Sequence, residues 1–176
     1  MSTTPTILIT NIEEAAVLAL EFDAVITAGP AAYEVGALFD HPDHLVVEFD
    51  DEIRRDWGGP TRADIRAILD FARERRDRSI LVHCHAGMSR STAVAIAILH
   101  DRGLPEADAF TAARAARPAD AIADERPFIP NPLVLAHADA ILGGALVDHD
   151  PDLAFDLATA DPDAWESTWT DPGAER

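Results

Sequence analysis

The stretch ILVHCHAGMSRSTAVAIAIL, residues 80–99, decides the fold that we expect for this chain. Its first three residues are all apolar, which is typical of a central strand covered on both faces. Residues 92–99 are apolar all round, which indicates a helix buried in the domain core. A short polar turn containing Gly87 joins the two. The stretch therefore predicts a buried strand, a tight turn and a buried helix.

The segments on either side repeat this alternation of strand and helix. Short apolar or β-branched runs bounded by turn residues predict strands at 6–10, 24–28 and 45–49. Capping signals and apolar stripes predict helices at about 12–21, 61–73, 105–116 and 132–143. Strands that alternate with helices predict an α/β fold with a mostly parallel central sheet flanked by helices.

One domain and a tail account for the length of the chain. We expect a single domain over residues 1–146, because 176 residues that are 48% hydrophobic are enough for one full-sized core. From residue 147 the chain becomes rich in Asp, Pro and Ala and contains two tryptophans, Trp165 and Trp169, without a convincing strand pattern. Residues 147–176 are therefore predicted to form an acidic tail.

The turn at residues 83–91 has the layout of an anion-binding site. Successive N–H groups in such a turn converge on a concave surface, and the start of the following helix adds partial positive charge. Arg90 can donate two parallel hydrogen bonds to a phosphate, a geometry that lysine cannot reproduce. A thiol at a helix N-terminus also ionises more readily than a free one. Cys84, the only cysteine, is therefore predicted to be a nucleophile rather than an inert buried thiol.

The pattern His83-Cys84, five residues, Arg90-Ser91 resembles the phosphate-binding loop of the cysteine-dependent protein tyrosine phosphatases. Around the loop, residues 6–145 resemble the compact dual-specificity phosphatases, so that family's fold is expected. The order of residues agrees, since the candidate acid precedes the loop here, whereas in low-molecular-weight phosphatases and arsenate reductases it follows.

The resemblance implies a phosphatase that acts on phosphotyrosine, with phosphoserine, phosphothreonine or small phosphomonoesters as further candidates. Cys84 would attack phosphorus and form a cysteinyl-phosphate, which water then hydrolyses. Ser91 would donate a hydrogen bond to the departing thiolate. The phosphate would be held by the Arg90 side chain and by the N–H groups of the loop, which belong to His85, Ala86, Gly87, Met88, Ser89 and Arg90.

The leaving group needs a proton, and the candidates follow the strand predicted at 45–49. Alignment with the family pattern, an apolar strand followed by Asp, favours Asp51. Neighbouring side chains on an extended strand point in opposite directions, so only one of Asp50 and Asp51 should face the loop. Asp50 is the second candidate and Asp56 a remote third. The chosen carboxylate would also serve as the general base for water.

Several histidines invite other interpretations. His83 should point away from Cys84, so we expect it to brace the loop from behind and to favour the thiolate. A zinc site needs more ligands at suitable spacing than His83 and His85 offer, so no metal is predicted. His41 and His44 flank a proline in a predicted loop and are expected to be solvated.

Two other functions remain open from the sequence. The first is a phosphate-binding adaptor without catalysis, which a missing general acid would favour. The second is a rhodanese-like sulfurtransferase, although five residues between Cys84 and Arg90 favour phosphate over persulfide chemistry.

The composition limits the partners of the chain. With 32 acidic and 14 basic residues the net charge is −18, which opposes binding to nucleic acid or to anionic membranes. A single cysteine and an N-terminus without a signal-like segment predict a cytoplasmic protein. We expect a phosphorylated protein or a small phosphomonoester as partner and no cofactor.

Overall fold

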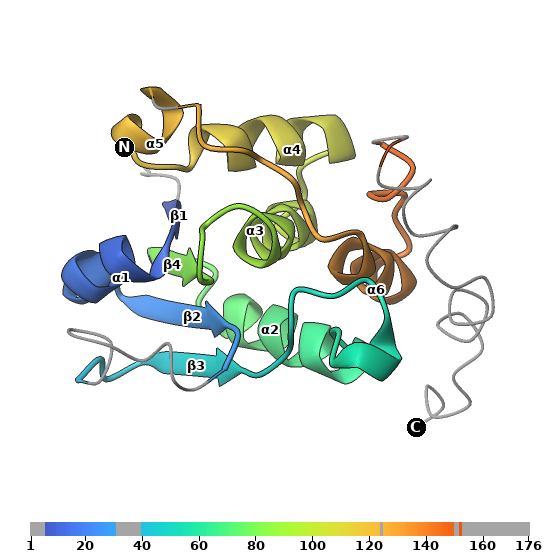
Figure 1. Ribbon diagram of the computed structural model, residues 1–176, viewed down its shortest axis with the longest axis horizontal. Helices are drawn as coiled ribbons and strands as arrows, with labels where there is room; N and C mark the ends of the chain where they lie inside the picture. The colour runs from blue at the N-terminus through green and yellow to red at the C-terminus, as the bar shows by residue number, and fades with distance from the viewer. Residues whose placement is uncertain (1–5, 31–39, 124, 150–151, 153–176) are drawn as a thin grey trace.

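The computed structural model describes residues 6–30, 40–123, 125–149 and 152. Four parallel strands form one sheet in the order β1-β4-β2-β3 (Figure 1). They are β1 Ile7–Thr10, β2 Ala24–Ala28, β3 His44–Val47 and β4 Ile80–His83. β4 lies between β1 and β2, and helices pack on both faces of the sheet, so its side chains are buried on either side, which explains its uninterrupted apolar sequence. The predicted α/β fold with a parallel central sheet is confirmed.

Helices connect and cover the strands. They are α1 Ile12–Leu18 with its 3₁₀ extension η1 Ala19–Glu21, η4 Arg55–Trp57, α2 Arg62–Glu74, α3 Arg90–Asp101, α4 Glu106–Ala115, α5 Ala119–Ala123 and α6 Pro132–Leu142. The sequence did not predict η4 or α5, which are short. It also extended β3 to residue 49, whereas the strand ends at Val47.

Capping residues set the helix starts as expected. The side chains of Asn11 and Thr61 each accept a hydrogen bond from the N–H group three residues later and close capping boxes on α1 and α2. Asn131 accepts hydrogen bonds from two N–H groups at the start of α6, which ends at Gly143 in the left-handed conformation. Pro105, expected as the first helical residue, is instead the N-cap of α4.

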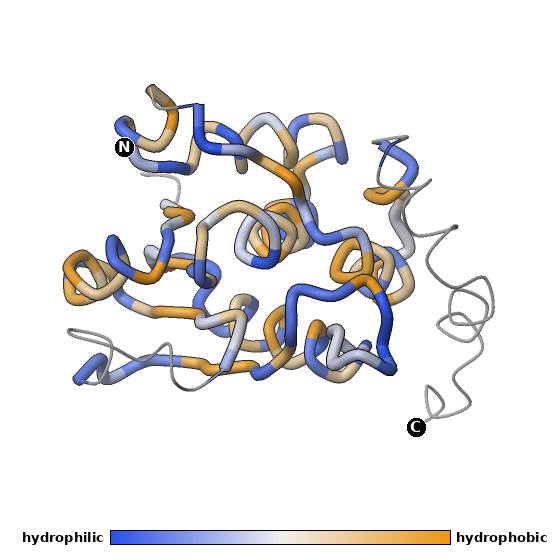
Figure 2. The backbone as a smooth tube through the Cα atoms, in the orientation of Figure 1, coloured by the Kyte–Doolittle hydropathy of each residue, from blue (hydrophilic) through white to orange (hydrophobic). Residues whose placement is uncertain are grey.

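The sheet has a thick layer on one face and a thin layer on the other. Helices α2 and α3 pack on one face, and α4 and α6 pack against α3. Alternate strand residues such as Ile9, Ile26 and Val82 point into this main core. On the opposite face, α1 covers a smaller cluster that includes Val25 and Leu81. Figure 2 shows that the segment following β3 is, in contrast, largely hydrophilic.

The end of the described chain is attached to this core. The carboxylate of Asp139 accepts hydrogen bonds from the N–H groups of Leu146, at 2.7 Å, and Val147, at 3.0 Å. Both residues are buried, and burial raises the pKa of Asp139. The boundary between domain and tail at residue 147 stays a prediction, and Trp165 and Trp169 lie outside the described residues.

Among the described helices, none is both long enough and apolar enough to cross a membrane.

His137 is a buried histidine that the fold holds neutral. It is 3% exposed on α6, and its Nε2 lies 3.0 Å from the carbonyl oxygen of Pro60, which can only accept. Its Nδ1 is buried, and among the described residues it has no hydrogen-bond partner. A second proton would have no acceptor there. Burial accordingly lowers the pKa of His137 from 6.5 to about 4.

We predict that His137→Gln makes the protein less sensitive to acid. The unfolded chain binds a proton near pH 6.5 that the folded chain does not bind until about pH 4. The free energy of unfolding therefore falls as the pH drops across that window, by about 3 kcal/mol for this group. Glutamine can keep the hydrogen bond to Pro60 but does not titrate. Urea unfolding at several pH values should show that the free energy of unfolding of this variant falls less steeply as the pH drops. His149 is exposed, and the His149→Gln control should follow the native chain.

Candidate active site

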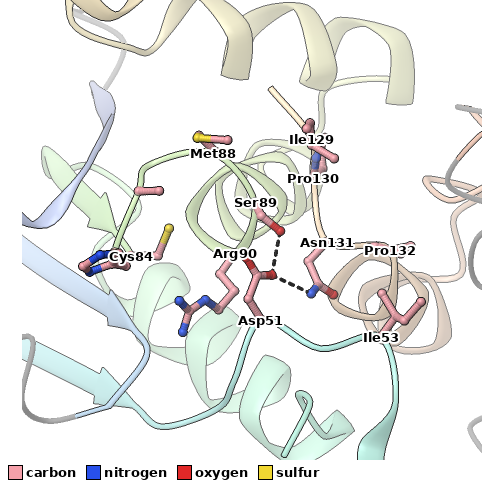
Figure 3. Close-up of a pocket in the computed structure, with 12 residues that line it drawn as sticks. Asp51, Ile53, Cys84, Met88, Ser89, Arg90, Ile129, Pro130, Asn131 and Pro132 are labelled. Atoms are coloured by element: carbon pink, nitrogen blue, oxygen red, sulfur yellow. Dashed lines mark hydrogen bonds between the residues drawn. The ribbon is translucent and has the colours of Figure 1, made fainter. Parts of the chain in front are cut away.

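The turn between β4 and α3 lies at the carboxyl edge of the sheet, directly after β4, which is one of its two interior strands. This edge is where open parallel sheets bind ligands. We call residues 84–89 the phosphate loop. Figure 3 shows the loop arching from Cys84 past Met88 to Ser89, where α3 begins.

Neighbouring segments hold the carbonyl groups of the phosphate loop from outside. The carbonyl of His85 accepts from the N–H of Ile12 at 3.1 Å, and that of Met88 accepts from Ile129 at 3.0 Å. The carbonyl of Ser89 accepts from Asn131 at 3.3 Å. In a trans peptide the C=O and N–H groups point in opposite directions. The N–H groups of these three peptides therefore point away from the surrounding segments, as an anion-binding cradle requires.

Gly87 is required by the close approach of the loop to the β1–α1 turn. Its φ is +69°, which is costly for a residue with a side chain. A Cβ at this position would also lie 2.8 Å from the backbone nitrogen of Asn11 and from the carbonyl carbon of Thr10. Both the loop conformation and its contact with β1 therefore depend on glycine.

Cys84 and Ser91 lie together at the base of the loop. The Sγ of Cys84 is 3.2 Å from the Oγ of Ser91. Both residues are nearly inaccessible, with Cys84 2% exposed and Ser91 0%, yet Cys84 lines an open pocket. The thiol is thus available at the bottom of the pocket and has a hydroxyl within hydrogen-bond distance.

Arg90 connects the phosphate loop to the end of the sheet. Its side chain is largely buried, at 6% exposed, and also lines the pocket. One guanidinium nitrogen donates to the carbonyl oxygen of Phe49 at 3.0 Å. This contact joins the loop to the segment that carries Asp50 and Asp51.

The structure brings Asp51 to the pocket and places the other two candidate acids elsewhere. Oδ1 of Asp51 accepts hydrogen bonds from the Oγ of Ser89 at 2.6 Å and from the Nδ2 of Asn131 at 2.9 Å (Figure 3). Asp50 lines a separate hollow beside Gly58. Asp56 is exposed on η4 and does not line the pocket.

The pocket has a volume of about 410 Å³. Its walls combine the phosphate loop with two distant segments, and the lining residues are Asp51, Ile53, Cys84, His85, Ala86, Met88, Ser89, Arg90, Ile129, Pro130, Asn131 and Pro132. Sequence reasoning missed Ile53 and residues 129–132 as pocket residues. In that part of the sequence only the helix cap at Asn131 was recognisable. A cap predicts what the side-chain oxygen of Asn131 contacts but not what its NH₂ group contacts.

His83 lies on the opposite side of the strand from Cys84 and is fully buried. Its Nε2 is 2.6 Å from the hydroxyl of Thr27, which is itself 2.7 Å from the Nε2 of His44. Its Nδ1 is 3.4 Å from the carbonyl oxygen of Cys84. Burial lowers the pKa of His83 to about 4, so at neutral pH these contacts are made by an uncharged imidazole, and its role in bracing the loop stays a prediction.

The expectation that His41 and His44 are solvated is wrong. His41 is 8% exposed, and its Nε2 lies 3.0 Å from the carbonyl oxygen of Phe22. His44 is half-buried and begins β3. Among the described residues, no three His, Cys, Asp or Glu side chains are grouped so that they could hold a metal ion.

Comparisons with known proteins identify the fold. No family model matches the chain, and no curated protein matches it. Solved structures do match. A variant of human DUSP28 superposes with a TM-score of 0.59 at 21% identity, covering 79% of this chain and 93% of its own. Tk-PTP in a mutant form gives 0.52 at 24% identity, with 78% and 92% covered. The Yvh1 phosphatase domain from Chaetomium thermophilum gives 0.53 at 17% identity, with 78% and 90% covered. The chain therefore has the fold of these phosphatases, as its sequence predicted.

We predict that Gly87→Ala distorts the phosphate loop. The left-handed φ costs about 1–2 kcal/mol for a residue with a side chain, and the contact with the β1–α1 turn adds about 1–3 kcal/mol. Gly143→Ala is the matched control, because Gly143 has a φ of +77° but no atom within 4 Å of an added Cβ. Thermal unfolding should show a larger drop in melting temperature for Gly87→Ala than for Gly143→Ala. Vanadate, a phosphate analogue, should raise the melting temperature of the native chain and of Gly143→Ala but not that of Gly87→Ala. Equal losses would mean that the close approach is unimportant.

Proposed function

We propose that this chain is a phosphatase that hydrolyses phosphotyrosine, or a similar phosphomonoester, through a cysteinyl-phosphate intermediate. One observation carries the proposal. The thiol of Cys84 lies at the base of a pocket whose walls include Arg90 and Asp51, beneath a loop three of whose carbonyl groups accept hydrogen bonds from neighbouring segments. The candidate nucleophile, the candidate anion cradle and the candidate acid thus line one cavity of suitable size, which supports the proposal.

In the first step, the thiolate of Cys84 attacks phosphorus and the bond from phosphorus to the leaving-group oxygen breaks. The loop N–H groups and the guanidinium of Arg90 stabilise the charge on the three non-bridging oxygens. Asp51, on the wall of the pocket, gives its proton to the leaving oxygen. The products of this step are the free alcohol or phenol, the cysteinyl-phosphate and the Asp51 carboxylate.

In the second step, water attacks the cysteinyl-phosphate and the carboxylate of Asp51 takes its proton. The S–P bond breaks and leaves a thiolate. The hydroxyl of Ser91, 3.2 Å from Sγ, donates a hydrogen bond to this developing charge. Inorganic phosphate leaves, and the enzyme is back in its starting protonation state, because Asp51 has regained a proton from water and Cys84 is again a thiolate.

The lining of the pocket favours a monoester with an apolar or aromatic leaving group. Among the described residues that line it, Arg90 is the only Arg or Lys, and Asp51 is the only carboxylate. Ile53, Met88 and Ile129 provide apolar surface around the opening. One phosphate has a cationic partner here and a second would not, so phosphotyrosine suits the pocket better than a polyphosphorylated substrate does.

We predict that the native chain hydrolyses p-nitrophenyl phosphate in the presence of a chelator and that Cys84→Ser abolishes turnover. Asp51→Asn should lower kcat/KM for phenyl phosphate by about 100-fold, because that leaving group needs a proton. The kcat/KM of the same variant should fall much less with 2,4-dinitrophenyl phosphate, because that leaving group departs without needing a proton.

Asp50→Asn is the matched control and should retain its activity, since Asp50 lines another hollow. A native protein that binds vanadate but turns over none of these esters would instead be a phosphate-binding adaptor. Turnover of thiosulfate without phosphatase activity would indicate a sulfurtransferase.

We also predict that Ser91→Ala slows the second step more than the first. Loss of a hydrogen bond to a charged thiolate costs about 1.5–3 kcal/mol, which corresponds to about 10- to 100-fold in rate. Stopped-flow measurement should then show a burst of p-nitrophenol followed by slow turnover. A uniform loss without a burst would contradict this role for Ser91.

A further inference from the structure

Asp51 lies on a segment that cannot position it alone. The segment between β3 and η4 has no regular secondary structure, and Asp51 is exposed. An exposed aspartate normally samples several rotamers. Here two donors converge on a single oxygen, Oδ1, from Ser89 at 2.6 Å and from Asn131 at 2.9 Å. These donors come from two different segments, so the carboxylate is held in one orientation.

The orientation of the Asn131 amide is fixed by the helix that it caps. Its Oδ1 accepts from the backbone N–H groups of Leu133 at 3.0 Å and Val134 at 3.1 Å. A backbone N–H can only donate, so the oxygen must face the helix and the NH₂ group must face the other way. That NH₂ group meets Asp51 and, at 3.2 Å, the carbonyl oxygen of Glu52.

Asn131 is also tied to the phosphate loop. Its backbone N–H donates to the carbonyl of Ser89 at 3.3 Å, and its side chain is buried, at 2% exposed. One residue therefore joins the start of α6, the phosphate loop and the segment that carries Asp51.

We propose that Asn131 is a positioning residue that holds Asp51 in the orientation for proton transfer. This inference rests on the proposed phosphatase function. Because the NH₂ group of Asn131 can only donate, Oδ1 of Asp51 is an acceptor and the catalytic proton resides on Oδ2.

The hydrogen bond from Asn131 to Asp51 becomes stronger as the proton leaves Asp51. When the Oδ2–H bond breaks and the proton moves to the leaving oxygen, the electron pair stays on Asp51 as a carboxylate. Hydrogen bonds to a charged acceptor are stronger than those to a neutral one. The donors from Asn131 and Ser89 therefore stabilise the transition state more than the ground state, which is the condition for a contribution to rate.

The experiment separates this role from the cap. In Asn131→Ser the shorter side chain can still cap α6, since serine is as good an N-cap as asparagine, but it lacks the NH₂ group that meets Asp51. The measured quantity is the ratio of kcat/KM for phenyl phosphate to kcat/KM for 2,4-dinitrophenyl phosphate. We expect this ratio to fall at least about tenfold, since only the first substrate depends on the acid.

Three controls make the result specific. Thr61→Ser exchanges a cap of α2, away from Asp51, and should leave the ratio at the native value. Ser89→Ala removes the other donor without altering α6 and should lower the ratio in the same direction. In an Asp51→Asn background, Asn131→Ser should change the ratio less than about twofold, because residues that act through one group are not additive.

Each outcome decides between the alternatives. If the native chain turns over neither ester, the proposed function fails and this inference fails with it. If the native chain is active and Asn131→Ser keeps the native ratio, this inference alone is overturned. If serine does not support α6, Asn131→Asp keeps an acceptor for the cap and places a second carboxylate against Asp51. It should also lower the ratio, and an unchanged ratio would overturn the inference.

Discussion

The close contact between Gly87 and the turn that follows β1 is the constraint on which the rest of the site depends. A Cβ at Gly87 would lie 2.8 Å from the backbone of Asn11, so the two segments can meet only because residue 87 has no side chain. The meeting brings the N–H of Ile12 to the carbonyl of His85. That hydrogen bond turns the peptide between His85 and Ala86 so that its N–H faces away from the β1–α1 turn. The direction of this N–H group thus depends on the close contact between Gly87 and the β1–α1 turn.

Three segments far apart in the sequence hold the phosphate loop: the β1–α1 turn, the segment after β3 and the segment before α6. An ion pair joins the first to the third, since the guanidinium of Arg126 contacts both carboxylate oxygens of Glu14, at 3.0 and 2.5 Å. Glu14 also closes the capping box of α1 through the N–H of Asn11. The side chains of Arg126 and Glu14 are only 20% and 16% exposed, so solvent screens the pair less than it would at the surface. The loop is therefore held by a frame of long-range contacts and does not depend on its own six residues alone.

The parts of the site that the sequence predicted are those whose geometry is local. Cys84, Arg90 and Ser91 lie within one strand–turn–helix unit, so their spacing alone places them together. Capping boxes at Asn11 and Thr61 were predictable for the same reason. Which of Asp50 and Asp51 faces the loop was harder, because β3 ends at Val47 and the alternation of an extended strand does not continue to residue 51. The partner of Asp51 at residue 131 depends on how α6 packs, which no local pattern encodes. His41 was misassigned because its acceptor is the carbonyl of Phe22, a contact between segments distant in sequence.

The proposed substrate is a dianion, although the net charge of the chain is −18. The structure explains how a strongly negative protein can bind a negatively charged substrate. Charges on the protein surface are screened over about 8 Å at physiological ionic strength, so most of the carboxylates have little effect on a buried phosphate. The donors in the loop and the Arg90 guanidinium act at hydrogen-bond distance, where dipoles and one charge are sufficient. Among the described residues that line the pocket, Asp51 is the only one with a carboxylate, so the pocket wall itself holds little of the negative charge of the chain. The acidic surface and the anion site thus operate over different distances, and the short-range geometry determines what the pocket can bind.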